Sequence, residues 1–209
     1  MAIHLSENVV KQKQPLTLTE ILRSRFKGIL DPIALLLNRI GLMPNTMTIV
    51  GLAGNTLGAY FLARGQMTLG GILIFLMGPI DALDGTMARL RGEPTDFGAF
   101  VDSVTDRYSE LVIFGGLLYY YLQQGDWLMA VLAYLAAAGS VLVSYTRARA
   151  QSLGVETKVG ILTRLERYLV LSPALIFNIP NIALWILAVL ANLTALQRIL
   201  DVRRKARRF

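Results

Sequence analysis

Long apolar segments make up most of this chain, and short polar segments separate them. A helix needs about 20 mostly apolar residues to cross the hydrocarbon core of a bilayer. Six segments approach or exceed that length, and they cover about residues 46–64, 67–90, 98–122, 127–150, 161–179 and 181–200. The pattern therefore predicts an all-α integral membrane protein with six transmembrane helices.

The segment before the first span has a different pattern. Apolar residues recur there at helical spacing among basic residues. This arrangement predicts an amphipathic helix in the membrane interface, with Thr17 or Thr19 as its N-cap. We expect Asp31-Pro32 to interrupt this helix, because proline lacks the N–H that an interior helical position donates. A short apolar helix to Ile40 would follow.

Three regions follow from these patterns. Residues 1–45 are predicted to form the N-terminal tail and the amphipathic helix, residues 46–200 the six-helix domain, and residues 201–209 a basic tail. The spans leave only short connections, so a separate soluble catalytic domain has no room. Any chemistry must belong to the membrane bundle itself.

Composition agrees with a membrane protein, since 54% of the residues are hydrophobic and only 17% are charged. The chain has no cysteine, which excludes disulfides, thiolate metal sites and cysteine nucleophiles.

Of the 21 lysines and arginines, only Arg64 falls on the side opposite the termini. The positive-inside rule then predicts a multi-pass protein of the cytoplasmic membrane with both termini in the cytosol. We interpret the net charge of +7 as orientation and attraction to anionic membrane lipid, not as nucleic-acid binding.

Four aspartates gather where two of the spans approach this cytosolic side. Asp81 and Asp84 lie near the end of one span, and Asp102 and Asp106 near the start of the next. Each pair falls on one face of a helix, and the short turn between the helices makes them antiparallel neighbours. Four carboxylates held together would repel one another unless cations lie between them, and oxygen-only ligation suits Mg²⁺ or Mn²⁺. The sequence therefore predicts a site for two divalent cations at the cytosolic face, of the kind that stabilises phosphate displacement.

The same stretch reads D-x2-D-G-x2-A-R-x8-G-x3-D-x3-D without a gap. It resembles the signature of the CDP-alcohol phosphotransferase family, and the six-span pattern extends the resemblance over nearly the whole chain. The resemblance implies an integral-membrane enzyme, usually a homodimer. Such an enzyme cleaves a CDP-linked lipid and joins its phosphatidyl group to a polar alcohol, with release of CMP.

The resemblance also implies roles for individual residues. Asp81, Asp84 and Asp102 would bind metal, while Asp106 would contribute to the second metal and take the proton of the acceptor hydroxyl. The positions that match family contacts to the cytidine diphosphate are Met43, Pro44, Asn45, Thr46, Gly85, Arg89 and Thr95. Arg89 has a physical argument as well, because a guanidinium group pairs well with phosphate oxygens.

Basic residues near the acids bear on the acceptor. They are Arg147, Arg149, Lys158, Arg164 and Arg167, and so dense a group suits an alcohol that carries its own phosphate. The same residues could instead serve only the positive-inside asymmetry. Residues 144–150 are similar to the segment that actinobacterial phosphatidylinositol-phosphate synthases use for inositol phosphate, where a lysine stands in place of Arg147. Inositol phosphate is therefore the favoured acceptor.

Two alternatives remain at this point. The first is glycerol 3-phosphate as acceptor, although enzymes of the family that use it usually have proline and lysine where this chain has Ser103 and Arg107. The second is a protein of another class, a cation transporter, since acids inside a membrane bundle can line an ion path. A transporter predicts acids distributed through the membrane depth, whereas here they gather at one end.

Overall fold

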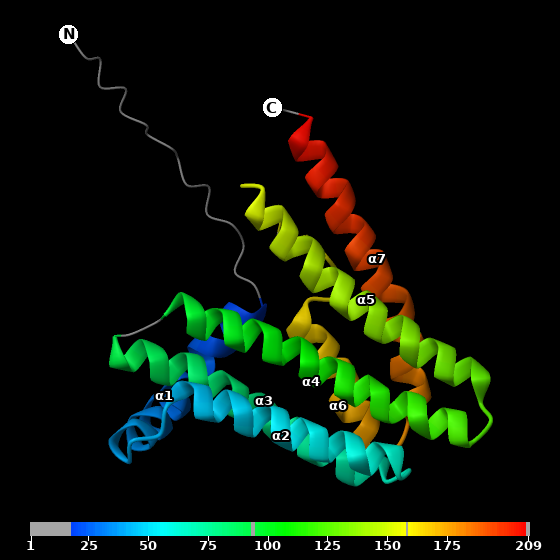
Figure 1. The fold of residues 1–209 in the computed structure, drawn as a ribbon, viewed down its shortest axis with the longest axis horizontal. Helices are drawn as coiled ribbons and strands as arrows, with labels where there is room; N and C mark the ends of the chain where they lie inside the picture. Colours follow the sequence, from blue (N-terminus) through cyan, green and yellow to red (C-terminus); the bar gives the residue numbers. More distant parts are fainter. Residues whose placement is uncertain (1–17, 93–94, 158, 208–209) are drawn as a thin grey trace.

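The structure, a computed structural model, describes residues 18–92, 95–157 and 159–207. Over these residues the chain is all-α and contains no strand (Figure 1). The helices are α1 (Leu18–Arg39), α2 (Pro44–Ala63), α3 (Met67–Arg91), α4 (Asp96–Gln123), α5 (Trp127–Ser152), α6 (Arg164–Ile176) and α7 (Pro180–Ala206). Thr17 and most of the predicted N-terminal tail lie outside the described residues.

Four of these helices are long and apolar enough to cross a bilayer, namely α2, α3, α5 and α7. The first half of α4 instead carries the charged residues of the acidic motif, and only the part after Glu110 is uniformly apolar. Helix α6 has 13 residues and is about 20 Å long, which is less than the hydrocarbon thickness. It is shorter than the predicted span over residues 161–179, because the chain before Arg164 is not helical.

The predicted interruption at Asp31-Pro32 is wrong, because α1 continues through Pro32 to Arg39. Packing on both sides of the proline explains the continuity. Leu30 before it and Ala34 after it belong to one apolar cluster with α3, and Ala34 is fully buried. Proline costs a helix one hydrogen bond, and tertiary contacts on both sides can offset that cost.

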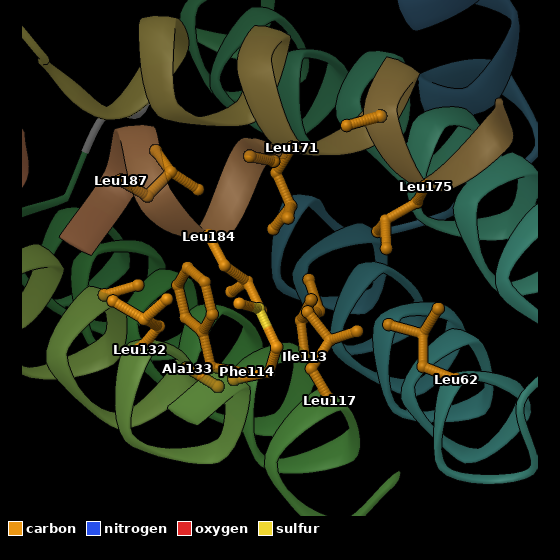
Figure 2. Packing of buried hydrophobic residues seen from close by; sticks show 14 of the residues in the cluster. Leu62, Ile113, Phe114, Leu117, Leu132, Ala133, Leu171, Leu175, Leu184 and Leu187 are labelled. Atoms are coloured by element: carbon orange, nitrogen blue, oxygen red, sulfur yellow. The ribbon is translucent and has the colours of Figure 1, made fainter. Parts of the chain in front are cut away.

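The helices pack around a buried apolar core. Helix α2 packs against α3 and α4, α4 against α5, and α5 against α7, while α6 lies against α3 and α7. Figure 2 shows side chains of α2, α4, α5, α6 and α7 pointing toward one another, among them Leu62, Leu117, Leu175 and Leu184, all fully buried. Helices α3 and α4 run antiparallel, but among the described residues α2 packs against both of them and they do not pack against each other along their lengths, so the prediction that they are direct neighbours is wrong. Only the end of α3 and the start of α4 meet, at one end of the bundle.

Local sequence explains where the two acid-bearing helices end and begin. Gly92 follows α3 with a φ of 71°, a left-handed conformation that glycine adopts without steric cost and that terminates a helix. The side chain of Thr95 caps α4 by accepting a hydrogen bond from the Gly98 backbone N–H at 3.0 Å. Asp96 in the first turn adds a favourable interaction with the helix dipole. These signals fix where α3 and α4 place their aspartates.

Candidate active site

The carboxylates of Asp81, Asp102 and Asp106 lie together at one end of the bundle. One oxygen from each residue lies within 4.8 Å of the other two. Asp81 comes from α3, and the other two are one turn apart on α4. The predicted convergence of two helices on one point is thus present for three of the four aspartates.

Asp84 lies outside this group of three and is almost fully buried. Its Oδ2 accepts a hydrogen bond of 2.8 Å from the hydroxyl of Thr48 on α2, and its Oδ1 accepts one from the backbone N–H of Gly85. The carboxylate is therefore held by groups of two helices. Thr48 was not predicted from the sequence, because nothing in a local pattern pairs residues 36 positions apart.

The three clustered carboxylates fit a divalent cation of the Mg²⁺ or Mn²⁺ type. They offer only oxygen atoms, and the part of the chain that the structure describes places no histidine beside them. Carboxylate oxygens are the ligands that these hard cations prefer. Three acids at this separation repel one another unless positive charge lies beside them.

Arg164 lies at the same place, at the first position of α6. Its Nη2 is 3.0 Å from Oδ2 of Asp81 and 2.5 Å from Oδ1 of Asp106. The side chain of Arg164 is 45% exposed, so it is accessible to a solute, whereas that of Asp106 is 13% exposed. The acidic cluster and at least one of the predicted acceptor-binding arginines are therefore in direct contact.

Arg167, one turn further along α6, has a different environment. It is 3% exposed and forms a salt bridge of 2.7 Å with Glu110 of α4. Its Nη1 also donates to the backbone carbonyl of Leu162 at 3.3 Å. These contacts tie the start of α6 to α4, and they occupy the guanidinium group of Arg167.

The other predicted acceptor-binding residues lie near the end of α5. Arg147 and Arg149 are both exposed there, and Arg149 donates to the hydroxyl of Ser152 at 3.2 Å. Lys158 lies outside the described residues. The buried Arg198 of α7 donates to the carbonyl of Val143, one turn before Arg147, at 2.6 Å. Sequence reasoning gave Arg198 no structural role.

The predicted nucleotide-binding residues come from three adjacent segments. Met43, Pro44, Asn45 and Thr46 form the start of α2, Gly85 and Arg89 lie on the last turns of α3, and Thr95 precedes α4. The amide oxygen of Asn45 lies 3.9 Å from where a Cβ on Gly98 would stand, so the start of α2 reaches the start of α4. Arg89 is exposed, and its Nη2 donates to the Thr86 hydroxyl at 2.9 Å. The start of α2 thus lies beside the start of α4, and Thr48 in the next turn of α2 reaches Asp84 of α3.

Several known proteins are similar to this chain. Residues 41–196 match the family described as CDP-alcohol phosphatidyltransferase. A phosphatidylinositol phosphate synthase of Streptomyces avermitilis is 39% identical over 205 residues, a match that covers 90% of this chain and 84% of that protein. An archaetidylinositol phosphate synthase of Pyrococcus horikoshii is 33% identical, and the match covers 88% of this chain and 96% of that protein.

The fold is similar to that of a solved enzyme. The crystal structure of Mycobacterium tuberculosis phosphatidylinositol phosphate synthase with CDP-DAG bound has a TM-score of 0.79 and 31% identity, covering 83% of this chain and 93% of that one. A crystal structure of the same enzyme in complex with manganese and citrate has a TM-score of 0.79 and 30% identity, with 83% and 88% covered. A protein with a similar fold thus binds both a CDP-linked lipid and a divalent metal.

Proposed function

Because this chain belongs to the CDP-alcohol phosphatidyltransferase family, we propose that it joins the phosphatidyl group of CDP-diacylglycerol to inositol phosphate and releases CMP. It is a membrane enzyme of phospholipid biosynthesis. The choice of acceptor rests on Arg164, which forms salt bridges with both Asp81 and Asp106 and remains exposed to solvent. A cation beside the reacting acids can bind an acceptor that carries its own phosphate.

In the proposed reaction the acceptor hydroxyl attacks the lipid-side phosphorus of the donor. The bond between that phosphorus and the oxygen of CMP breaks, and the proton of the hydroxyl passes to the carboxylate of Asp106. Two divalent cations bound by Asp81, Asp84, Asp102 and Asp106 would supply neutralisation of the diphosphate and stabilisation of the leaving CMP. No covalent intermediate with the enzyme is required.

The donor nucleotide is proposed to bind between the start of α2, the end of α3 and the start of α4. Its contacts would be Met43, Pro44, Asn45, Thr46, Gly85, Arg89 and Thr95. Arg89 would hold phosphate oxygens, for which a guanidinium group is well shaped. Gly85 leaves room for the nucleotide to approach the backbone of α3.

The acceptor phosphate is proposed to bind Arg164, with Arg147, Arg149 and Lys158 adding positive charge around it. Arg167 serves the same site indirectly, because its buried salt bridge to Glu110 holds the start of α6 in place. Glycerol 3-phosphate also carries a phosphate and remains the alternative acceptor.

The proposed topology has six crossings, with the acidic cluster and both termini on the cytosolic side. Tyr121 at the end of α4 hydrogen-bonds to Asn181 at the start of α7, whereas Lys205 at the end of α7 donates to the Glu156 carbonyl after α5. These contacts support a chain that passes between opposite faces along α4 and again along α6. Helix α4 is long enough to cross but carries charges in its first half, whereas α6 has only 13 residues. The distribution of basic residues supports the cytosolic assignment. The enzyme is proposed to be a homodimer, as the resemblance implies.

An acceptor panel tests the proposal. Purified enzyme in vesicles with CDP-diacylglycerol and Mn²⁺ receives inositol 1-phosphate, glycerol 3-phosphate, inositol or serine in separate reactions, and CMP release is measured. We expect CMP release with inositol 1-phosphate and little with the others. A faster reaction with glycerol 3-phosphate would establish the alternative, and a faster reaction with inositol or serine would refute a phosphorylated acceptor.

The variant Arg164→Ala sharpens the same test. Loss of a charge-assisted contact should raise the KM for the phosphorylated acceptor about tenfold or more and leave the KM for the donor unchanged. Arg64→Ala, at the turn after α2 on the opposite face, is the matched control and should change neither constant. Equal effects of the two substitutions would contradict the assignment of Arg164.

A further inference from the structure

Arg91, the last residue of α3, ties the turn between α1 and α2 to the end of α3. Its Nε donates to the side-chain oxygen of Asn38 at 2.7 Å, and its Nη2 donates to the backbone carbonyl of Leu42 at 2.5 Å. Asn38 belongs to the last turn of α1, and Leu42 immediately precedes Met43, where the proposed donor-binding segment begins. One guanidinium group thus bridges three parts of the chain.

Asn38 completes the bridge with its other polar atom. Its Nδ2 donates to the backbone carbonyl of Met87 on α3 at 3.2 Å. The amide therefore accepts from one residue of α3 and donates to another, one turn away. This pairing holds the end of α1 against α3 in one orientation.

A small apolar cluster lies beneath these polar contacts. Ala34 of α1, Met47 of α2, and Leu83 and Met87 of α3 are buried together. Met47 is one residue beyond the proposed donor-binding segment. The first turn of α2 therefore packs on α1 and α3 through apolar contacts, and Arg91 holds the turn just before it through the Leu42 carbonyl, separately from the main core.

This support is needed because the proposed donor-binding residues are themselves exposed. Met43, Asn45 and Thr46 all have exposed side chains. The chain reaches them through Gly41, whose φ of 83° is a conformation that other residues rarely adopt. A segment of this kind holds a fixed position only where neighbouring elements constrain it.

We propose that Arg91 and Asn38 are positioning residues that hold the first turn of α2 in place for the cytidine diphosphate of the donor. This inference rests on the proposed function and deepens it, because it assigns the donor site two residues that are not fixed positions of the aspartate motif. The contacts of Arg91 support an indirect role. Two of its three guanidinium nitrogens already bind protein oxygens, whereas Arg89 has its side chain exposed.

The test measures kcat, the KM for CDP-diacylglycerol and the KM for the acceptor in the Arg91→Lys and Asn38→Ala variants. A lysine keeps the charge but cannot reach both oxygens with a planar fork. Either variant should raise the KM for CDP-diacylglycerol about tenfold, with the acceptor KM and kcat within about twofold of wild type. Inhibition by free CDP, which lacks the lipid tails, should weaken by the same factor. Arg39→Lys, at the neighbouring exposed position of α1, is the matched control and should change nothing.

A double variant distinguishes positioning from general damage. Because both residues act through one bridge, Asn38→Ala combined with Arg91→Lys should raise the donor KM no more than about threefold beyond either single change. The inference would be overturned if the double variant raised the donor KM by the product of the two single effects. Equal changes in the donor KM and the acceptor KM would overturn it as well. So would an unchanged donor KM in a folded Arg91→Lys variant. Failure of the proposed function itself would appear differently, as absence of CMP release by the wild-type enzyme.

Discussion

Asp106 combines features that suit a base at a metal-dependent site. Its side chain is 13% exposed, lies in the cluster with Asp81 and Asp102, and contacts Arg164. A carboxylate in this position can accept a proton from a hydroxyl that is activated by neighbouring positive charge. The proposed role therefore needs both oxygens of Asp106, one for the cation and one for the proton.

Asp106→Asn tests that role, because an amide keeps the shape of the side chain and cannot accept the proton. We expect transfer to fall at least about a hundredfold, with retention of CDP-lipid binding. CMP release measures the first quantity, and equilibrium binding of a labelled CDP-lipid measures the second. Full transferase activity in this variant would rule out Asp106 as the base.

Thr48 offers a second test at the residue scale, since its hydroxyl donates to the buried Asp84. Residues that hydrogen-bond to metal ligands commonly change metal affinity by about tenfold or more when they are replaced. Thr48→Val keeps the shape and loses the hydrogen bond, so it should weaken Mn²⁺ binding by about that factor.

Direct titration of free Mn²⁺ by electron paramagnetic resonance measures this effect independently of activity. Thr48→Ser keeps the hydroxyl and should bind Mn²⁺ like the wild type. Equal Mn²⁺ affinities of the valine variant and the wild type would show that the hydrogen bond from Thr48 to Asp84 does not contribute to metal binding.

The site residues that could be predicted from the sequence are those that lie close together along the chain. The aspartates are separated by three, eighteen and four positions, so helical periodicity places each pair on one face and the short turn brings the two pairs to one end, although Asp84 lies outside the cluster. The bond from Thr48 to Asp84 and the bridge of Arg91 to Asn38 join residues 36 and 53 positions apart. Such pairs depend on how helices dock, and no local pattern encodes them.

Helix α6 places its arginines through a buried ion pair with α4. Arg167 is 3% exposed, and its partner Glu110 is 19% exposed. Removing one member of a buried pair leaves an uncompensated charge, which is more costly than the pair itself is favourable.

Glu110→Ala should therefore lower the free energy of unfolding by about 3 kcal/mol. Thermal unfolding in detergent, followed by circular dichroism, measures the loss. Glu110→Gln keeps an oxygen that can accept a hydrogen bond from Arg167, so it should lower the free energy of unfolding by less than Glu110→Ala does. Comparable stability of the alanine variant and the wild type would mean that water or lipid headgroups solvate Arg167.

Among the helices, the predicted starts of the spans at residues 46 and 98 fall two residues inside α2 and α4, which begin at Pro44 and Asp96. The break predicted at Pro32 is absent because residues on both sides of it pack against α3, and such tertiary contacts cannot be predicted from the local sequence. The short α6 was also unpredictable, since apolar residues continue beyond both of its ends and periodicity cannot tell a helix from an apolar loop.

For the whole molecule, the match over residues 41–196 confirms the family that eight fixed positions predicted. The described residues are also all-α, as predicted, and four of their helices are long and apolar enough to cross a bilayer. The count of six crossings, the division into three regions, the cytosolic orientation and the dimer stay predictions.

The absence of cysteine makes the topology testable without removing native thiols. Gln124→Cys, in the turn between α4 and α5, and Gln151→Cys, near the end of α5, both replace exposed residues. In intact cells a membrane-impermeant maleimide should label the first and spare the second until the membrane is opened. The reverse pattern would place the acidic cluster outside the cytosol.

The acidic cluster lies where α3 and α4 emerge from the apolar part of the bundle, and this has a kinetic consequence. In the proposed reaction the donor, which carries the reacting phosphorus, diffuses within the bilayer, whereas the acceptor that attacks it arrives from water. The rate then depends on the mole fraction of CDP-lipid in the bilayer and on the molar concentration of the acceptor. Adding inert lipid at constant volume slows the enzyme at subsaturating donor, whereas diluting vesicles at constant acceptor leaves the turnover of each enzyme unchanged.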